Sequence, residues 1–316
     1  MQDVAYHRAT EFNFPDASSR LYPTNPAGRW QLEVGFGDGR FWAEQHRLEP
    51  EVNYLGVEIS GVAVQKAISR YRGAGVKRAV IARLAAEWVV QHVVPVHALE
   101  RVYVNFPDPW PKTRHEESRL LRPSFLEMLT TRLTDSGEVW LTTDHPGYLE
   151  FALESARATN LYEITRPEPP AAALQTKYAM RWQGMGLPVF HARFRKTAES
   201  QNSFTPLQRF EMPHAVMTGN LPTEKLEKIV KQDKHYTVIL FERYLGDNRV
   251  MVLARTEETD FTQEVLIAAT KRQDGQIVVG LEPFGSPLIT AGVKAAVGAV
   301  ADWLETQGMT VVRRAH

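Results

Sequence analysis

The segment NFPDPWPKTRH, residues 105–115, places an acid between two prolines and follows it with a group of basic side chains. Pro107 and Pro109 restrict the backbone on both sides of Asp108, so its carboxylate is held in a defined position. Trp110 offers an aromatic face on which a base can stack. A solvent-exposed proline-rich loop is the alternative interpretation. The side chains that can bind phosphate here are Lys112, Arg114 and His115.

Three glycines lie in the segment LEVGFGDGRF, residues 32–41, directly after a run of strand-forming residues. Glycines at the end of a strand allow a sharp turn and a close approach of the backbone to a ligand. A dinucleotide-binding fingerprint would need glycine at position 40, where this sequence has Arg40, so NAD is disfavoured. A tight turn in any fold of alternating strands and helices is the structural alternative. The glycines are Gly35, Gly37 and Gly39.

Two glutamates lie at the ends of neighbouring predicted strands. Glu33 precedes the glycines, and Glu58 closes the segment YLGVE. In an open sheet of parallel strands, ligands bind at the carboxyl ends of the strands, and an acid on the second strand accepts hydrogen bonds from ribose hydroxyls. The pair therefore indicates a nucleoside-type cofactor without a pyrophosphate.

Two further candidate sites follow later in the chain. Asp144 ends the segment EVWLTTD, and it either binds a ligand or caps the helix that we expect to begin at Pro146. The segment TKYAMRW, residues 176–182, lies within residues 166–196, which carry six basic residues and one acid. The basic and aromatic side chains of this stretch suit nucleic acid, whereas a solvated pair of strands is the alternative.

Alternating strands and helices must position these residues. From residue 30 onward, short β-rich runs alternate with segments compatible with helix, which is typical of βαβ units and of a parallel sheet covered on both faces. Two later candidate strands complete a seven-stranded sheet. The predicted strands are residues 30–34, 54–59, 78–83, 101–106, 138–143, 162–167 and 189–196, and the predicted helices are residues 39–48, 61–73, 85–94, 118–133 and 146–158.

A polar, Ser/Thr-rich segment that ends in proline, residues 197–206, indicates a linker. We therefore expect one domain in residues 1–200 and a second in residues 207–316. In the second domain, a helix-like segment at 222–232 precedes three apolar alternating runs and a closing helical pattern, which predicts a small α+β domain. The apolar runs are residues 236–245, 249–258 and 264–272, and the helical pattern is residues 291–308.

The composition limits the classes of function. Lys and Arg together number 37, as do Asp and Glu, so no overall field directs the protein to nucleic acid or to an anionic membrane. The absence of cysteine removes disulfides, thiolate nucleophiles and cysteine-based zinc sites, and we predict no metal site. The sequence contains no signal-peptide pattern and no uncharged apolar run of about 18 residues. We therefore expect a cytoplasmic protein without a membrane partner.

Taken in order along the chain, these motifs resemble the bacterial tRNA (guanine-N7-)-methyltransferase family. The match consists of E-x-G-x-G-x-G, an acid that closes the second strand, N-F-P-D-P-W-x-K-x-R-H, T-D and T-K-Y, and it covers about residues 25–197. The resemblance implies a class I S-adenosylmethionine-dependent methyltransferase fold, with S-adenosyl-L-methionine as cofactor and tRNA as substrate. It also implies methyl transfer to N7 of a guanine in the variable loop.

The resemblance assigns roles to matching residues, with Asp108 in catalysis and cofactor contact and Glu58 at the ribose. Leu84 and Ala85 stand where the family has Asp or Asn followed by Ala to reach the adenine. The residues matched to the family and those singled out for their chemistry together form two candidate sites. The candidate cofactor site is Glu33, Gly35, Gly37, Gly39, Glu58, Leu84, Ala85 and Asp108. The candidate tRNA site is Lys112, Arg114, His115, Asp144, Thr176, Lys177 and Tyr178.

The sequence departs from the family pattern in other places too. Glu116 and Glu117 follow His115, where the family often continues with basic residues, and Ala179 replaces the acid that ends T-K-[YF]-E, which predicts the loss of a polar contact to substrate. The family's usual chain stops near residue 197, so the second domain is an addition. We expect that domain to bind RNA, a protein partner or a second copy of the chain.

Two other functions remain as alternatives. One is a catalytically weak or inactive protein that keeps the methyltransferase fold and binds RNA or protein. The other is a methyltransferase that acts on another RNA. The charged set around Asp108 favours an active enzyme, because a binding protein has no physical need for it.

Overall fold

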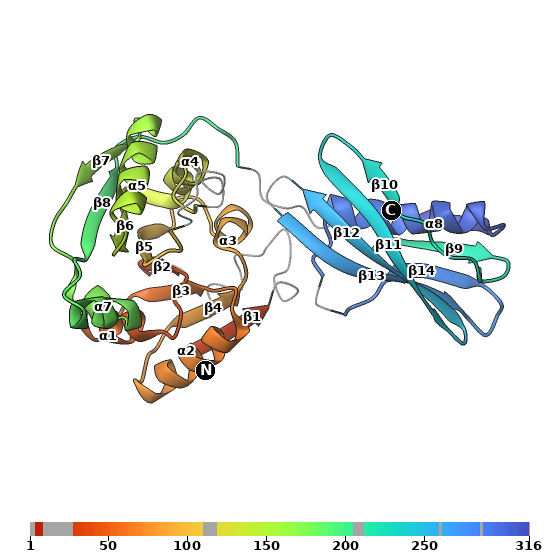
Figure 1. The fold of residues 1–316 in the computed structure, drawn as a ribbon, viewed down its shortest axis with the longest axis horizontal. Coiled ribbons are helices and arrows are strands. Elements are labelled where there is room, and N and C mark those ends of the chain that lie inside the picture. Colours follow the sequence, from red (N-terminus) through yellow and green to blue (C-terminus); the bar gives the residue numbers. More distant parts are fainter. Residues whose placement is uncertain are drawn as a thin grey trace. The chain divides into compact units, whose positions relative to one another are not determined.

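The computed structural model describes residues 4–8, 28–109, 119–204, 212–258, 261–284 and 287–315. The chain divides into two compact units, the first with the described residues up to 204 and the second with those from 212 onward. We call them the N-terminal unit and the C-terminal unit, and Figure 1 shows the elements of each. None of the described helices has the length and apolar composition that a membrane span requires.

The N-terminal unit is built on one sheet of eight strands in the order β1-β4-β3-β2-β5-β6-β8-β7. The strands from β1 to β6 in this order are parallel, whereas β8 is antiparallel to both β6 and β7. The bounds are β1 Val4–Arg8, β2 Trp30–Val34, β3 Asn53–Val57, β4 Ala79–Arg83, β5 Leu99–Asn105, β6 Leu133–Thr143, β7 Tyr162–Thr165 and β8 Phe190–Lys196.

The mostly parallel sheet of a class I methyltransferase fold is therefore confirmed. All seven strands expected from the sequence are present. The eighth strand, β1, was not expected, and it adds to one edge by parallel pairing with β4, from Val4 opposite Ala79 to Arg8 opposite Arg83.

Helices cover both faces of this sheet (Figure 1). Helices α1, α2 and α6 pack on one face, and α7 packs against α6. Helices α3, α4 and α5 pack on the other face. The bounds are α1 Arg40–Leu48, α2 Gly61–Gly73, α3 Ala86–His92, α4 Pro123–Arg132, α5 Pro146–Thr159, α6 Ala171–Leu174 and α7 Lys177–Gly184.

The order of the strands reverses between β2 and β5, which are neighbours in the sheet. From β2 the chain moves outward through β3 to β4, and it then returns to β5 on the other side of β2. At such a switch point the connections after the two strands leave to opposite faces and open a crevice at the carboxyl ends of the strands. The loops after β2 and β5 are therefore the expected walls of a ligand site.

Packing of α1 against α2 explains the glycine at position 39. Gly39 has a φ of 78°, and a Cβ atom there would lie 2.8 Å from Cε1 of Tyr71 and 2.9 Å from Cβ of Ala67, both on α2. Gly37 has a φ of 56°, but a Cβ atom there would have no heavy atom within 4 Å. Position 39 is therefore restricted by packing and by backbone conformation, whereas position 37 is restricted by backbone conformation alone.

The C-terminal unit is an antiparallel sheet in the order β10-β11-β12-β13-β14-β9-β15, with the single helix α8 on one face (Figure 1). This arrangement confirms the predicted α+β class. The bounds are β9 His214–Thr218, β10 Ile229–Gln232, β11 Tyr236–Gly246, β12 Arg249–Glu258, β13 Phe261–Lys271, β14 Ile277–Leu281, α8 Ala291–Thr306 and β15 Thr310–Ala315.

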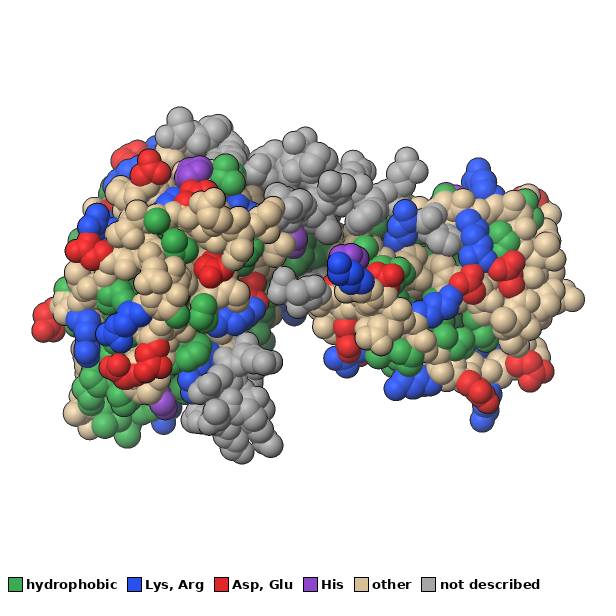
Figure 2. Space-filling view, turned by 90° about the horizontal axis from the view of Figure 1, so that it is seen from above, with side chains coloured by type: hydrophobic (Ala, Val, Ile, Leu, Met, Phe, Trp, Pro, Cys, Tyr) green, Lys and Arg blue, Asp and Glu red, His purple; other side chains and the backbone are tan. Residues whose placement is uncertain are grey.

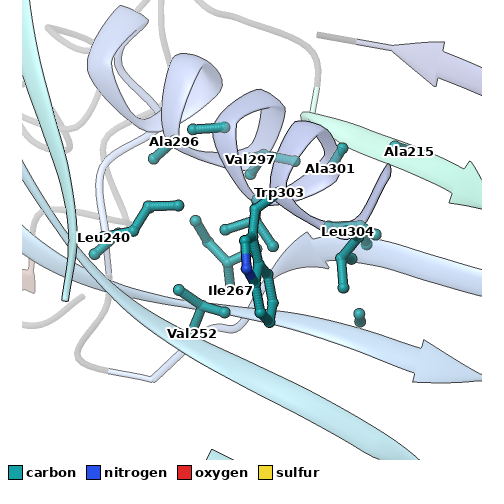
Figure 3. Close-up of a cluster of buried hydrophobic side chains, with 14 of the residues drawn as sticks. Ala215, Leu240, Val252, Ile267, Ala296, Val297, Ala301, Trp303 and Leu304 are labelled. Atoms are coloured by element: carbon teal, nitrogen blue, oxygen red, sulfur yellow. The ribbon is translucent and has the colours of Figure 1, made fainter. Parts of the chain in front are cut away.

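One buried cluster joins α8 to this sheet. Figure 3 shows Trp303 of α8 lying against Val252 and Ile267 of the sheet, and all three side chains are at most 5% exposed. The Thr290 hydroxyl accepts the Val293 N–H and caps the start of α8. The apolar face of the predicted closing helix is therefore what holds the C-terminal unit together.

The predicted helix at residues 222–232 is wrong. Residues 229–232 form strand β10 instead, and the preceding residues of the segment are neither helix nor strand. Ile229 pairs with Leu240 of β11 and packs against the core, while Lys231 forms an ion pair with Asp302 of α8. The free edge of β11 offers backbone partners, and this tertiary pairing outweighs the helical preference of the Lys- and Glu-rich segment.

We expect Gly39→Ala to lower the free energy of unfolding by about 2–4 kcal/mol, because left-handed strain adds to a clash with α2. Gly37→Ala is the matched control, and only the strain of about 1–2 kcal/mol applies to it. Chemical denaturation followed by circular dichroism measures both variants. Equal losses would contradict the packing argument.

Candidate active site

The loop after β2 forms one wall of the crevice at the switch point. Gly35, Gly37 and Gly39 have φ values of 68°, 56° and 78°, a conformation that glycine adopts without strain. The Gly35 N–H donates to the Val57 carbonyl of β3 at 2.8 Å. A Cβ atom at Gly35 or Gly37 would meet no heavy atom within 4 Å, so a ligand can approach the backbone of the loop closely.

Glu58 connects this loop to the strand beside it. Its carboxylate, directly after β3, accepts the Gly37 N–H at 3.1 Å and the Ser60 N–H at 2.9 Å. A carboxylate has about four acceptor positions, so Glu58 can hold the loop and still accept hydrogen bonds from ribose hydroxyls. Its place agrees with the predicted ribose contact, which stays a prediction.

Glu33 lies beneath the loop and is only 1% exposed. The Tyr54 hydroxyl donates to its Oε2 at 2.8 Å, and Asn105 Nδ2 donates to its Oε1 at 3.4 Å. The Tyr54 hydroxyl also lies 3.0 Å from that of Tyr71. Burial raises the pKa of Glu33 to about 8, against the opposing effect of the two hydrogen bonds. The group joins β2, β3 and β5 from inside the unit, and the predicted cofactor contact of Glu33 stays a prediction.

Asp38 anchors the far end of the same loop. Its Oδ2 accepts Arg40 Nε at 3.0 Å and Arg70 Nη2 at 3.3 Å, and its carbonyl accepts Arg70 Nε at 2.8 Å. Arg40, which stands where a dinucleotide-binding loop has glycine, therefore has a partner within the loop itself.

The loop after β5 forms the opposite wall and carries Asp108. The Phe106 N–H donates to the Thr142 carbonyl of β6 at 2.7 Å, and the Pro109 carbonyl accepts Arg119 Nε at 3.2 Å. These two anchors flank Asp108, whose side chain is exposed. Backbone contacts therefore add to the prolines in holding the carboxylate.

Asp144 directly follows β6 on the same rim. Strands β5 and β6 are parallel neighbours with Asn105 opposite Thr142, so the residues after them meet at one edge of the sheet. The cap of α5 is His145, whose Nδ1 accepts the Tyr148 N–H at 3.0 Å. The alternative in which Asp144 caps this helix is therefore wrong, and its predicted contact with tRNA stays a prediction.

The segment TKYAMRW forms most of helix α7, which was not predicted from the sequence. The Thr176 hydroxyl caps α7 by accepting the Ala179 N–H at 3.3 Å, and it donates to the Ala173 carbonyl at 2.8 Å. Lys177 and Tyr178 are exposed in the first turn. Thr176 therefore caps α7, and the substrate contacts predicted for Thr176, Lys177 and Tyr178 stay predictions.

Burial explains the alanine at position 179. Ala179 is 0% exposed, so the side chain at this position of α7 points into the unit. An acid here would lose its hydration, which is costly without a partner. The expected loss of a polar substrate contact at this position stays a prediction.

Leu84 and Ala85 connect β4 to α3 beside Glu58, for which a ribose contact is predicted. Leu84 is 9% exposed and Ala85 is exposed, and the Glu58 N–H donates to the Ala82 carbonyl of β4 at 3.2 Å. Their apolar surface suits the face of a nucleobase. Neither side chain has a polar group that could bind the amino group of adenine, as the family's Asp or Asn would. Adenine contact by these residues stays a prediction.

Comparison with known proteins decides the family. Residues 28–192 match the family model described as "Putative methyltransferase". The tRNA (guanine-N(7)-)-methyltransferase of Deinococcus radiodurans is 46% identical over 98% of this chain and 99% of its own. The chain belongs to the tRNA (guanine-N7-)-methyltransferase family. The enzyme of that name from Thermus thermophilus is 43% identical over 89% of this chain and 91% of its own, and that from Halorhodospira halophila is 36% identical over 52% and 73%.

The six basic residues of 166–196, which we expected to suit nucleic acid, do not form one continuous basic surface. Lys196 is buried and pairs with Glu199, Arg195 pairs with Glu163, and Arg193 stacks 3.9 Å from the centroid of the Trp140 ring. In Figure 2, acidic and basic side chains are interspersed over the visible face of each unit. Among the six, Lys177 and Arg181 are exposed on α7, and Arg166 is exposed just after β7.

Several predicted residues of the family motif lie outside the described residues. They belong to the segment that follows Pro109, so the base stacking expected of Trp110 and the phosphate contacts expected of the three basic residues stay predictions. They are Trp110, Lys112, Arg114 and His115.

The residues that hold the two loops were not predicted from the sequence. Asn105 carries a local signal, since it directly precedes FPDPW, and its amide bonds Glu33. Tyr54 and Arg119 carry no such signal, because their partners lie 21 and 10 residues away in the chain. These contacts are visible only once the strands are placed side by side.

We expect Glu33→Gln to flatten the pH dependence of stability. Because burial raises the pKa of Glu33 from 4.5 to about 8, its contribution to stability is fully present below its unfolded pKa and is lost as the pH rises through about 8. Glutamine does not ionise, so the variant should lose this slope. Chemical denaturation between about pH 5 and 8 measures it. Glu100→Gln, at a partly exposed position, is the control. If Glu33→Gln leaves the slope of unfolding free energy against pH unchanged, the raised pKa of Glu33 is contradicted.

Proposed function

We propose that the chain transfers the methyl group of S-adenosylmethionine to N7 of a guanine in the variable loop of tRNA. The observation that carries the proposal is the meeting of two loops at the switch point of the sheet. One is the open glycine loop bound by Glu58, and the other is the anchored loop that exposes Asp108. Family membership supports the reaction class and the tRNA substrate.

The described residues fit the cofactor. Backbone at Gly35 and Gly37 leaves open space that a Cβ atom would fill, Glu58 can accept from ribose hydroxyls, and Leu84 and Ala85 offer an apolar wall for the base. When bound, S-adenosylmethionine supplies an electrophilic methyl group on a positively charged sulfur. The loop after β2 and Glu58 would hold it beside the loop that carries Asp108.

The reaction requires no proton transfer to or from the protein before the methyl group moves. Guanine N7 has a lone pair in the plane of the base, so it attacks the methyl carbon without losing a proton. The N7–carbon bond forms as the carbon–sulfur bond breaks, the positive charge passes from sulfur to the base, and the thioether leaves. Catalysis then consists mainly of alignment and of charges placed nearby, which a carboxylate fixed at Asp108 supplies.

The Asp108 carboxylate can act in two ways in this reaction. It can accept hydrogen bonds from the N–H groups on the Watson–Crick edge of guanine and so orient N7, or it can lie beside the positive charge as that charge moves. Lys177 and Tyr178 on α7, with Asp144 on the rim, would bind the substrate around it. Arg114, Lys112 and His115 would add phosphate contacts. A tRNA substrate also implies action in the cytoplasm.

The C-terminal unit is proposed to bind a macromolecule and to take no part in the chemistry. The relative from Halorhodospira halophila shares the name although only 52% of this chain matches it, which supports a catalytic portion about the size of the N-terminal unit. The partner of the C-terminal unit is tRNA itself, a protein or a second copy of the chain.

We expect labelled methyl transfer from S-adenosylmethionine to unmodified tRNA to give 7-methylguanosine when the product nucleosides are separated by chromatography. Asp108→Ala should lower kcat by about a hundredfold or more, because the fixed charge is lost. Asp135→Ala is the control. It removes an exposed acid near the start of β6, at the opposite end of the strand from Asp144, and should keep full activity.

Two results would contradict the proposal. Full activity in Asp108→Ala would remove this residue from the site. A folded protein that binds S-adenosylmethionine but forms no 7-methylguanosine would show that the substrate is wrong.

A further inference from the structure

Phe106 has a backbone conformation that is unusual for its residue type. Its φ is 51°, in the left-handed region that bulky residues rarely adopt. The next residue is Pro107, and a residue before proline normally prefers an extended conformation. A strained conformation of this kind persists only where surrounding contacts impose it, and such residues gather at functional sites. This one lies two residues before Asp108.

Two contacts impose the conformation of Phe106. Its N–H donates to the Thr142 carbonyl at 2.7 Å, which fixes the backbone against β6. Its ring stacks on that of Tyr178, with the centroids 6.2 Å apart and the planes inclined by 30°. This separation lies within the range of favourable offset aromatic pairs. The first contact comes from the sheet and the second from helix α7.

Helix α7 also contacts the other wall of the crevice. The guanidinium of Arg40, in the first turn of α1, lies 3.6 Å from Sδ of Met180. Tyr178 and Met180 therefore place one short helix against the Asp108 loop and against the end of the glycine loop. Tyr178 remains 51% exposed, so a substrate can contact the face of α7 that reaches Phe106.

We propose that Phe106 is a positioning residue for Asp108 and that Tyr178 keeps Phe106 in place. The inference rests on the proposed function, in which Asp108 acts in methyl transfer. With its ring held against Tyr178, Phe106 keeps the left-handed turn that directs Asp108 into the crevice. Without that contact, Phe106 relaxes toward the conformation preferred before proline, and the carboxylate moves. A displacement of about 1 Å at a reacting centre can lower a rate by about a hundredfold.

Single variants test the contact through kcat for methyl transfer, KM for tRNA and Kd for S-adenosylhomocysteine. Phe106→Gly removes the ring and frees the backbone, and Tyr178→Ala removes the partner ring. Both should lower kcat by about 10- to 100-fold with the Kd changed less than about twofold. Tyr178→Phe keeps the ring that contacts Phe106, so its kcat should be higher than that of Tyr178→Ala. Leu187→Ala, 45% exposed beyond the end of α7, is the matched control for loss of exposed apolar surface and should keep kcat.

The double variant decides whether the two residues act through their contact. Phe106→Gly combined with Tyr178→Ala should have a kcat no lower than Phe106→Gly alone, because both changes remove the same interaction. Losses in kcat that multiply would show independent action and overturn the proposal. A raised KM for tRNA with unchanged kcat in Tyr178→Ala would also overturn it, because Tyr178 would then only bind substrate.

Asp108→Ala in the same assay separates this inference from the proposed function. Unchanged kcat in Asp108→Ala would defeat the role of Asp108 and the inference with it. Loss of kcat in Asp108→Ala with full kcat in Phe106→Gly would defeat the inference alone. If Phe106→Gly does not fold, Tyr178→Ala and Tyr178→Phe still decide, since Tyr178 is half exposed and its truncation removes little buried surface.

Discussion

The two walls of the crevice depend on one buried carboxyl group. Glu33 on β2 accepts hydrogen bonds from Tyr54 on β3 and Asn105 on β5, so a single side chain joins three neighbouring strands. A buried polar group is costly when it loses its partners, which makes the three residues interdependent. The glycine loop begins two residues after Glu33, and the Asp108 loop begins directly after Asn105. The relative position of the proposed cofactor loop and catalytic loop is therefore set inside the sheet.

Much of the N-terminal unit could be predicted because its signals are local. Glycines after a strand, prolines around an acid and an alternation of β-rich and helical runs identified the loop of Gly35 to Gly39, Asp108 and all but one strand of the sheet. The partners that hold these residues could not be predicted. The Thr142 carbonyl and Arg119 reach the Asp108 loop from later in the chain, and periodicity carries no information about such pairing.

The errors also have physical causes. Residues 229–232 have helical composition, but the unpaired edge of β11 supplies hydrogen-bond partners that composition does not reveal. Lys196 counted as part of a basic surface, although its ammonium group donates to the Leu133 carbonyl in a buried position. Helix α7 is short, and its exposed and buried positions gave no clear helical period in the sequence. In the first two cases contacts between distant segments override a local preference, whereas in α7 the local signal itself is weak.

The first and last strands of the C-terminal unit, β9 and β15, pair with each other, from His214 opposite Ala315 to Thr218 opposite Thr310. Because its entering and leaving strands are neighbours, the unit completes its own sheet without a strand from the N-terminal unit. In evolution, a unit with a self-contained sheet can be added or lost while the catalytic sheet keeps its strand order. Family members that share about half of this chain, and others that share nearly all of it, are what such modular exchange produces.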